Sequence, residues 1–128
     1  MFISEDGVVK QGDFGLAAQL EHTLSVRATT CGTPVYAAPE VFDSTGVLKS
    51  DIWSLGMSVI EIAEGKHPFS GLSPFQVMNR VANTSPPTLS SSDWSESMVD
   101  FVSKCLVKDV EKRASAEELM KVSSFLTL

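Results

Sequence analysis

Apolar residues follow a helical pattern most clearly between positions 49 and 64. They fall on all sides of a helical wheel there, which predicts a central, buried helix. Gly65 ends this helix, because glycine readily adopts the left-handed conformation found just after a helix. Pro68 excludes any continuation.

Three more helices are predicted further along the chain. Ser73-Pro74 is typical of an N-cap followed by a first-turn proline, and it begins a helix that ends near Val81. A second helix spans 95–107 and carries its apolar residues on one face. A third spans 115–122, where a serine is followed by acidic residues that favour a helix N-terminus.

The first forty residues follow a different pattern. Two short apolar runs, 2–4 and 8–10, flank Glu5-Asp6-Gly7, which predicts a small β-hairpin. From 13 to 40 there is little periodicity and much serine and threonine, so we expect a long loop, and long ordered loops are usually functional. The pattern therefore predicts a mainly α fold with one small hairpin.

Composition narrows the classes of function. The chain has 128 residues and a net charge of −6, and its ten Lys and Arg are scattered, which argues against nucleic acid as a partner. The longest apolar run is too short to cross a membrane. Cys31 and Cys105 are far apart, so we expect reduced thiols and a cytoplasmic location.

Three short motifs stand in a fixed order: Asp13-Phe14-Gly15, Ala38-Pro39-Glu40 and Asp51-Ile52-Trp53-Ser54-Leu55-Gly56. In this order and at these intervals they resemble the C-terminal lobe of eukaryotic protein kinases, and the resemblance covers nearly the whole chain. It implies that residues 1–128 form a partial protein kinase domain, with a small β-hairpin, an activation segment and four main helices.

Finer features resemble one kinase group. The stretch 13–20, its distance to Gly32-Thr33-Pro34, and the segments 61–66 and 86–89 are similar to Ste20-like serine/threonine kinases, with MAP kinase kinases as close relatives. The departures from the family pattern are mild and occur at Gly12, Ala37 and Val110.

The resemblance implies roles for several residues in the first half of the chain. Asp13 would hold Mg²⁺ against the phosphates of ATP, and the alternative is an ordinary turn aspartate. Activating phosphorylation would fall on Thr29, with Thr30 and Ser25 as further candidates, although ordinary loop hydroxyls are favoured for these last two. The substrate-facing loop would contain Gly32, Thr33, Pro34 and Tyr36.

Other residues are expected to be structural. The resemblance pairs Glu40 with Arg113, whose planar guanidinium suits a carboxylate better than lysine does. Asp51 would favour the dipole at the start of the central helix. We expect His67 to be a surface loop residue without a metal-binding role.

No glycine-rich phosphate loop, strand lysine or His-Arg-Asp motif precedes Asp13, and Met1 falls about where a catalytic loop would end. We therefore expect no catalysis, ATP or Mg²⁺ for the isolated chain, although the kinase family uses both. The chain would be an incomplete sequence of an active kinase, a remnant, or a non-catalytic binding module that acts through 73–81 and 29–40.

Protein substrates or an upstream kinase are the expected partners. The helices at 95–107 and 115–122 cannot cover both sides of the central helix. We therefore expect an exposed apolar patch and self-association through it.

Overall fold

The computed structural model describes residues 2–14, 33–43, 49–90 and 93–121. The fold is mainly helical with one small sheet, as predicted. In chain order, its elements are β1 (Phe2–Ile3), β2 (Val9–Lys10), the 3-10 turn η1 (Pro34–Tyr36), α1 (Pro39–Asp43), α2 (Ser50–Glu64), α3 (Pro74–Asn83), α4 (Glu96–Cys105) and α5 (Ala116–Met120).

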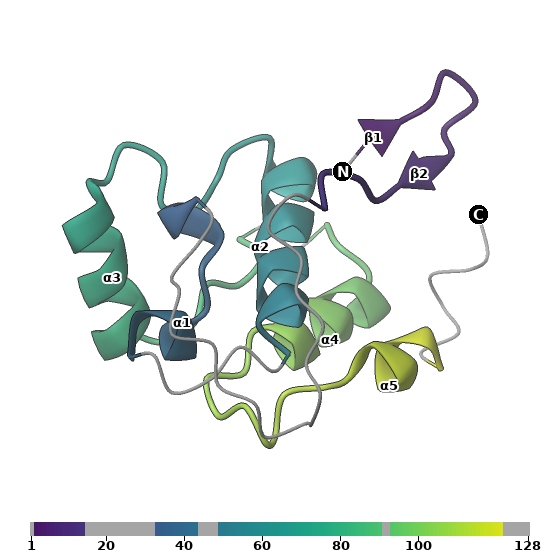
Figure 1. The fold of residues 1–128 in the computed structure, drawn as a ribbon. Coiled ribbons are helices and arrows are strands. Elements are labelled where there is room, and N and C mark those ends of the chain that lie inside the picture. Colours follow the sequence, from purple (N-terminus) through teal and green to yellow (C-terminus); the bar gives the residue numbers. More distant parts are fainter. Residues whose placement is uncertain (1, 15–32, 44–48, 91–92, 122–128) are drawn as a thin grey trace.

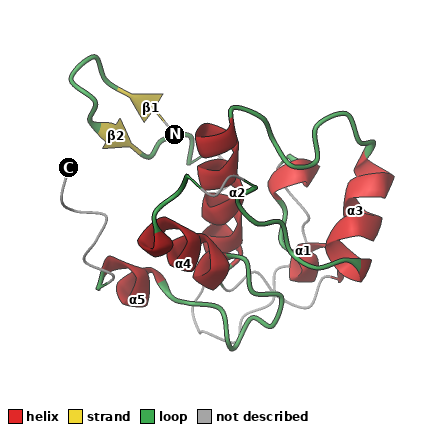
Figure 2. Cartoon of the chain, turned by 180° about the vertical axis from the view of Figure 1, so that it is seen from behind, coloured by secondary structure: helices red, strands yellow, loops and turns green. Residues whose placement is uncertain are grey.

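Helix α2 lies at the centre of the molecule. Helices α4 and α5 lie on one side of it, and η1, α1 and α3 lie on the other (Figures 1 and 2). Gly65 follows α2 with a φ of 68°, so the predicted left-handed C-cap is confirmed. Within the described residues, no helix is both long and apolar enough to span a membrane.

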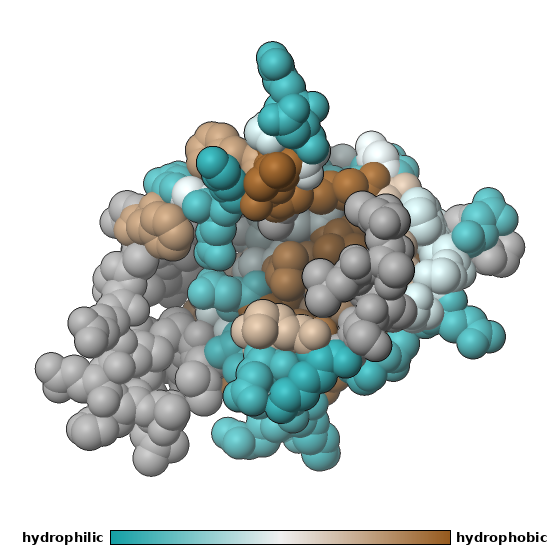
Figure 3. Space-filling model, turned by 90° about the vertical axis from the view of Figure 1, so that its right-hand side faces the viewer, coloured by the Kyte–Doolittle hydropathy of each residue, from teal (hydrophilic) through white to brown (hydrophobic). Residues whose placement is uncertain are grey.

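The prediction that α2 is buried holds for one face of the helix only. Its buried residues are Trp53, Gly56, Met57 and Ile60, which follow one helical stripe, whereas the side chain of Ile62 is 67% exposed. A helical wheel shows where apolar residues lie on a helix, but a side chain is buried only where a neighbouring element packs against it. Figure 3 shows apolar side chains gathered on the face that carries the hairpin.

Gly56 explains how closely α2 and α4 approach each other. A Cβ atom at this position would lie 2.7 Å from Cβ of Cys105 and 2.9 Å from two side-chain carbons of Leu106. Atoms this close would overlap, so the helix crossing requires glycine here.

The helix starts agree with the sequence-based predictions. The Ser73 hydroxyl accepts from the backbone N–H of Gln76, whose side chain accepts from the Ser73 N–H in return. Ser115 and Glu118 form the same reciprocal pair at α5. The serine before α4, Ser95, accepts from the backbone N–H of Met98.

The structure differs from the sequence-based predictions at helix ends and in short elements. Helix α3 extends two residues beyond the predicted end, α4 ends two residues early, and the predicted end of α5 lies outside the described residues. The turn η1 lies in the segment predicted as loop, and helix α1 begins at its end and extends to Asp43. Both are too short to show a helical repeat.

The hairpin has the predicted position and turn. Phe2 pairs with Lys10 and Ile3 with Val9, and Gly7 has a φ of 78°. All four paired residues are exposed, and the hairpin projects away from the helices (Figure 1).

The core joins the helices around α2. Its buried apolar side chains are Ala38, Trp53, Met57, Ile60, Phe69, Val77, Val81, Val102, Cys105, Leu106 and Leu119.

Candidate functional site

The turn η1 is anchored directly on α2. The Tyr36 hydroxyl donates to Oε2 of Glu61 at 2.5 Å, and the Ser54 hydroxyl donates to the Tyr36 carbonyl at 2.9 Å. The hydrogen bond to Glu61, together with burial and the negative charge of that carboxylate, raises the pKa of Tyr36. One helix therefore holds both the backbone and the side chain of this turn, which includes the predicted substrate-facing residues Pro34 and Tyr36.

His67 supports Tyr36 from the side. The two rings are nearly perpendicular, with centroids 4.8 Å apart. Nδ1 of His67 accepts from the Phe69 N–H at 3.0 Å. Burial lowers the pKa of His67, and the Glu61 charge opposes this change.

The prediction that His67 is a surface residue is wrong, because the side chain is buried at 7% exposure. The sequence shows a histidine beside a proline, but it does not show that Tyr36 packs on the ring from 31 positions away.

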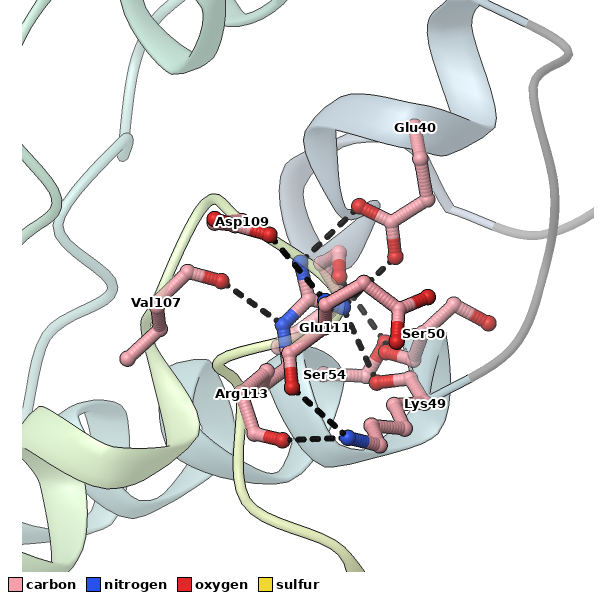
Figure 4. Close-up of polar contacts among 9 residues, drawn as sticks. Glu40, Lys49, Ser50, Ser54, Val107, Asp109, Glu111 and Arg113 are labelled. Atoms are coloured by element: carbon pink, nitrogen blue, oxygen red, sulfur yellow. Dashed lines mark hydrogen bonds and ion pairs between the residues drawn. The ribbon is translucent and has the colours of Figure 1, made fainter.

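Glu40 and Arg113 form a buried, bidentate ion pair (Figure 4). Nη1 and Nη2 of Arg113 donate to the two carboxylate oxygens of Glu40 at 2.5 and 2.9 Å. Nε donates to the Val107 carbonyl at 2.8 Å. The guanidinium also lies 5.3 Å from the ring centroid of Trp53. This arrangement ties α1 to α2 and to the loop before α5.

Lys49 joins the same cluster, and the sequence analysis did not find it. Its Nζ donates to the Arg113 carbonyl at 2.7 Å and to the Glu111 carbonyl at 3.4 Å. Nη1 of Arg113 donates to the Lys49 carbonyl at 3.0 Å. Lys49 precedes α2 with a φ of 60°, a left-handed conformation that is unusual for lysine.

Comparison with known proteins identifies the family of this fold. The family model for the protein kinase domain matches residues 1–125. The chain belongs to the protein kinase domain family. It is 42% identical over 123 residues to "Serine/threonine-protein kinase hippo" of Drosophila melanogaster. It is 45% identical over 118 residues to "Serine/threonine-protein kinase ppk11" of Schizosaccharomyces pombe.

These relatives confirm the assignment to a Ste20-like serine/threonine kinase. The matches cover 94% and 91% of this chain, but only 18% of hippo and 38% of ppk11. The chain therefore spans a minor part of the length of both relatives.

Protein kinases use ATP and Mg²⁺. In this kinase domain, the predicted metal ligand Asp13 follows the hairpin, is exposed and has a φ of 64°. Among the residues that the structure describes, no group of three or more His, Cys, Asp or Glu could hold a metal ion. A magnesium site needs several oxygen ligands together with the nucleotide phosphates, so these residues alone do not fit one.

The structure gives less detail for the remaining predicted residues of the kinase domain. Asp51 lies exposed in the first turn of α2, where its effect on the helix dipole stays a prediction. Thr33 precedes η1 and makes no side-chain cap to it. The predicted sites Ser25, Thr29, Thr30 and Gly32 lie outside the described residues.

Proposed function

We propose that these residues form the substrate-facing part of an ATP-dependent protein serine/threonine kinase that acts in intracellular signalling in the cytoplasm. The observation that carries this proposal is the anchoring of η1 on α2 through Tyr36, Glu61 and Ser54. The names of both relatives support serine and threonine as the acceptors.

A fixed loop suits phosphoryl transfer, because catalysis in this reaction depends mainly on positioning. A protein substrate must present its hydroxyl in line with the phosphorus that it attacks. Tyr36 is held at both its hydroxyl and its carbonyl, so the backbone of η1 offers a rigid surface against which a substrate peptide can lie. The buried pair of Glu40 and Arg113 fixes the helix that follows.

We also propose that the 128 residues on their own transfer no phosphate and bind no nucleotide. Asp13 is a single exposed carboxylate, and the sequence contains neither a glycine-rich phosphate loop nor a His-Arg-Asp motif. Within an active kinase, ATP and Mg²⁺ would therefore need further groups besides Asp13.

The first experiment measures phosphate transfer from Mg-ATP to a generic acceptor protein by two samples, the native gene product and the 128-residue chain. The native gene product that contains these residues should phosphorylate serine and threonine, and Asp13→Asn should abolish this activity. The purified 128-residue chain should show no transfer and no rise in melting temperature with nucleotide. An inactive native product would refute the kinase proposal. ATP turnover by the isolated chain would refute only the second proposal.

We propose Thr29 as the regulatory phosphorylation site, with Thr30 and Ser25 as secondary candidates. Phosphate on such a loop can order it by pairing with arginine side chains. Incubation with an active Ste20-like kinase followed by mass spectrometry should find phosphate on Thr29. Phosphate confined to other positions would contradict the assignment.

A non-catalytic binding module is the alternative, and one observation favours it. Helix α3 exposes two large apolar side chains one turn apart, Phe75 at 70% and Met78 at 36%. If the native product is inactive with Mg-ATP, this helix face becomes the main candidate for a protein contact. Phe75→Ala with Met78→Ala should then abolish binding to a substrate or regulator of the parent kinase while leaving stability unchanged.

A further inference from the structure

The last residue of α2 holds a segment that lies more than twenty positions away. Oε1 of Glu64 accepts from the Ser90 N–H at 2.8 Å and from the indole N–H of Trp94 at 3.1 Å. Oε2 of Glu64 accepts from the Ser90 hydroxyl at 2.5 Å. Both carboxylate oxygens therefore bind the chain between α3 and α4.

The Glu64 carboxylate needs hydrogen-bond donors, because a carboxylate at a helix C-terminus faces the negative end of the helix dipole. Three donors converge on Glu64 and satisfy that charge. The contact lies immediately before α4, whose N-cap is Ser95 and which packs on α2. It therefore fixes how the chain approaches α4.

Ser90 is also accessible to an enzyme. The residue is exposed, and residues 85–90 form no helix or strand. Asp93 follows Ser90 by three positions, and protein kinases select substrates by charge pattern, so this stretch suits an enzyme with a basic recognition surface. The Ser90 hydroxyl itself is engaged by its hydrogen bond to Glu64.

We propose that Ser90 is a phosphorylation site for an acid-directed protein kinase, and that its phosphate releases Ser90 and Trp94 from Glu64. The Ser90 oxygen attacks the γ-phosphorus of ATP. A new O–P bond forms and the bond from that phosphorus to the β,γ-bridging oxygen breaks. ADP leaves, and the hydroxyl proton passes to the base of the modifying enzyme.

The release follows from charge and from the loss of a donor. Phosphoserine carries a charge of about −1.5 to −2 and has no hydroxyl proton to donate to Glu64. It would place that charge against the carboxylate that now accepts from the same oxygen at 2.5 Å. The Ser90 N–H and the Trp94 indole would then leave Glu64 with the segment.

The bound and released forms also differ as substrates. In the bound form the Ser90 hydroxyl is engaged, so the enzyme must act on the released form, and the phosphate then prevents rebinding. Glu64→Gln weakens the contact selectively. The neutral amide replaces charge-assisted hydrogen bonds with weaker ones, and its NH₂ group meets the Ser90 oxygen as a donor.

The contact of Glu64 and the anchor of η1 lie on the same helix. Glu61, which accepts from Tyr36, lies three residues before Glu64 on the same helix. The modification thus acts on the helix that anchors η1. The proposal does not depend on any phosphotransfer by the chain itself.

The experiment treats the purified chain with Mg-ATP and an acid-directed serine kinase, and maps phosphate by mass spectrometry. We expect phosphate on Ser90, none at that position in Ser90→Ala, and several-fold faster modification of Glu64→Gln. Phosphorylation should shift Trp94 emission to the red and increase its quenching by acrylamide. Trp94→Phe supplies the background signal from Trp53.

Two results would overturn the proposal. If Ser90 stays unmodified in both the natural chain and Glu64→Gln, it is not a site for this class of enzyme. If Ser90 is modified but Trp94 fluorescence is unchanged, the phosphate does not release the segment. Ser90→Asp gives a second readout of release, since a carboxylate in place of the hydroxyl should also expose Trp94.

Discussion

Lys49 and Arg113 exchange hydrogen bonds across 64 positions of sequence: each side chain donates to the backbone carbonyl of the other residue, at 2.7 and 3.0 Å. This exchange lies beside the buried pair of Arg113 and Glu40. The start of α2 is therefore fixed by a residue from the loop before α5, in addition to its own helical bonds.

The hydrogen bonds of the Lys49 amine stabilise the fold, whereas its left-handed backbone destabilises the fold. Two substitutions separate these effects. Lys49→Met removes the bonds from Nζ and keeps the left-handed φ of 60°. Lys49→Gly also removes the bonds but relieves the backbone, so it should be about 1 kcal/mol more stable than Lys49→Met in urea unfolding. Equal stabilities would show that the left-handed conformation costs nothing here.

Breaking the ion pair from one side should be costly. Arg113→Ala leaves Glu40 as a buried carboxylate without its partner, and Glu40 is only 5% exposed. We expect a loss of about 3–5 kcal/mol in the free energy of unfolding, measured by urea titration.

The matched control replaces both members. Glu40→Gln with Arg113→Met leaves no isolated charge, so the double variant should lose less than Arg113→Ala does. If the double variant is less stable than Arg113→Ala, the isolated charge is not the main cause of the loss in the single variant.

The stability of the fold should fall in mild acid because of His67. Burial lowers its pKa from the ordinary value of 6.5. Below about pH 6.5 the unfolded chain gains a proton while the folded chain stays neutral, so this contribution is present above that pH and is lost below it. His67→Asn keeps an acceptor for the Phe69 N–H but does not titrate. It should flatten the fall in unfolding free energy between about pH 7 and 5, and an unchanged slope would assign the fall to other groups.

Self-association should depend on the exposed apolar side chains of α2 and α4. Ile62 and Val99 are 67% and 45% exposed. Ile62→Lys with Val99→Lys should lower both the sedimentation coefficient and the binding of a hydrophobic dye. Stability should change by less than about 1 kcal/mol, since neither side chain is buried.

Phe75→Lys is the control for this prediction, because Phe75 is equally exposed but lies on α3, on the other side of α2. A parallel decrease in that variant would mean that charge alone prevents association. No decrease in either variant would exclude these surfaces as the contact.

Sequence predicted the features that depend on near neighbours. The caps at Ser73 and Ser115 involve residues three positions apart, and Gly65 acts through its own backbone, so local pattern was sufficient. The kinase resemblance indicated the pair of Glu40 and Arg113, which no local pattern could have given.

Features that depend on residues distant in sequence were absent from the predictions or were predicted wrongly. His67 is buried because Tyr36 packs on its ring, and Lys49 adopts its left-handed conformation where it meets Arg113. Ile62 is exposed because no described element packs over it, although its residue type fits a core. In each case the outcome was set by contacts that are distant in sequence.

The separation of Glu40 and Arg113 also orders events during synthesis of the chain. The two lie 73 positions apart, and a ribosome adds residues at about 5–20 per second. Until Arg113 emerges, the Glu40 carboxylate must stay in water, because burial without its partner would strand a charge. Helix α1 therefore docks only after the loop before α5 has been made, and the nascent chain exposes α1 to chaperones throughout that interval.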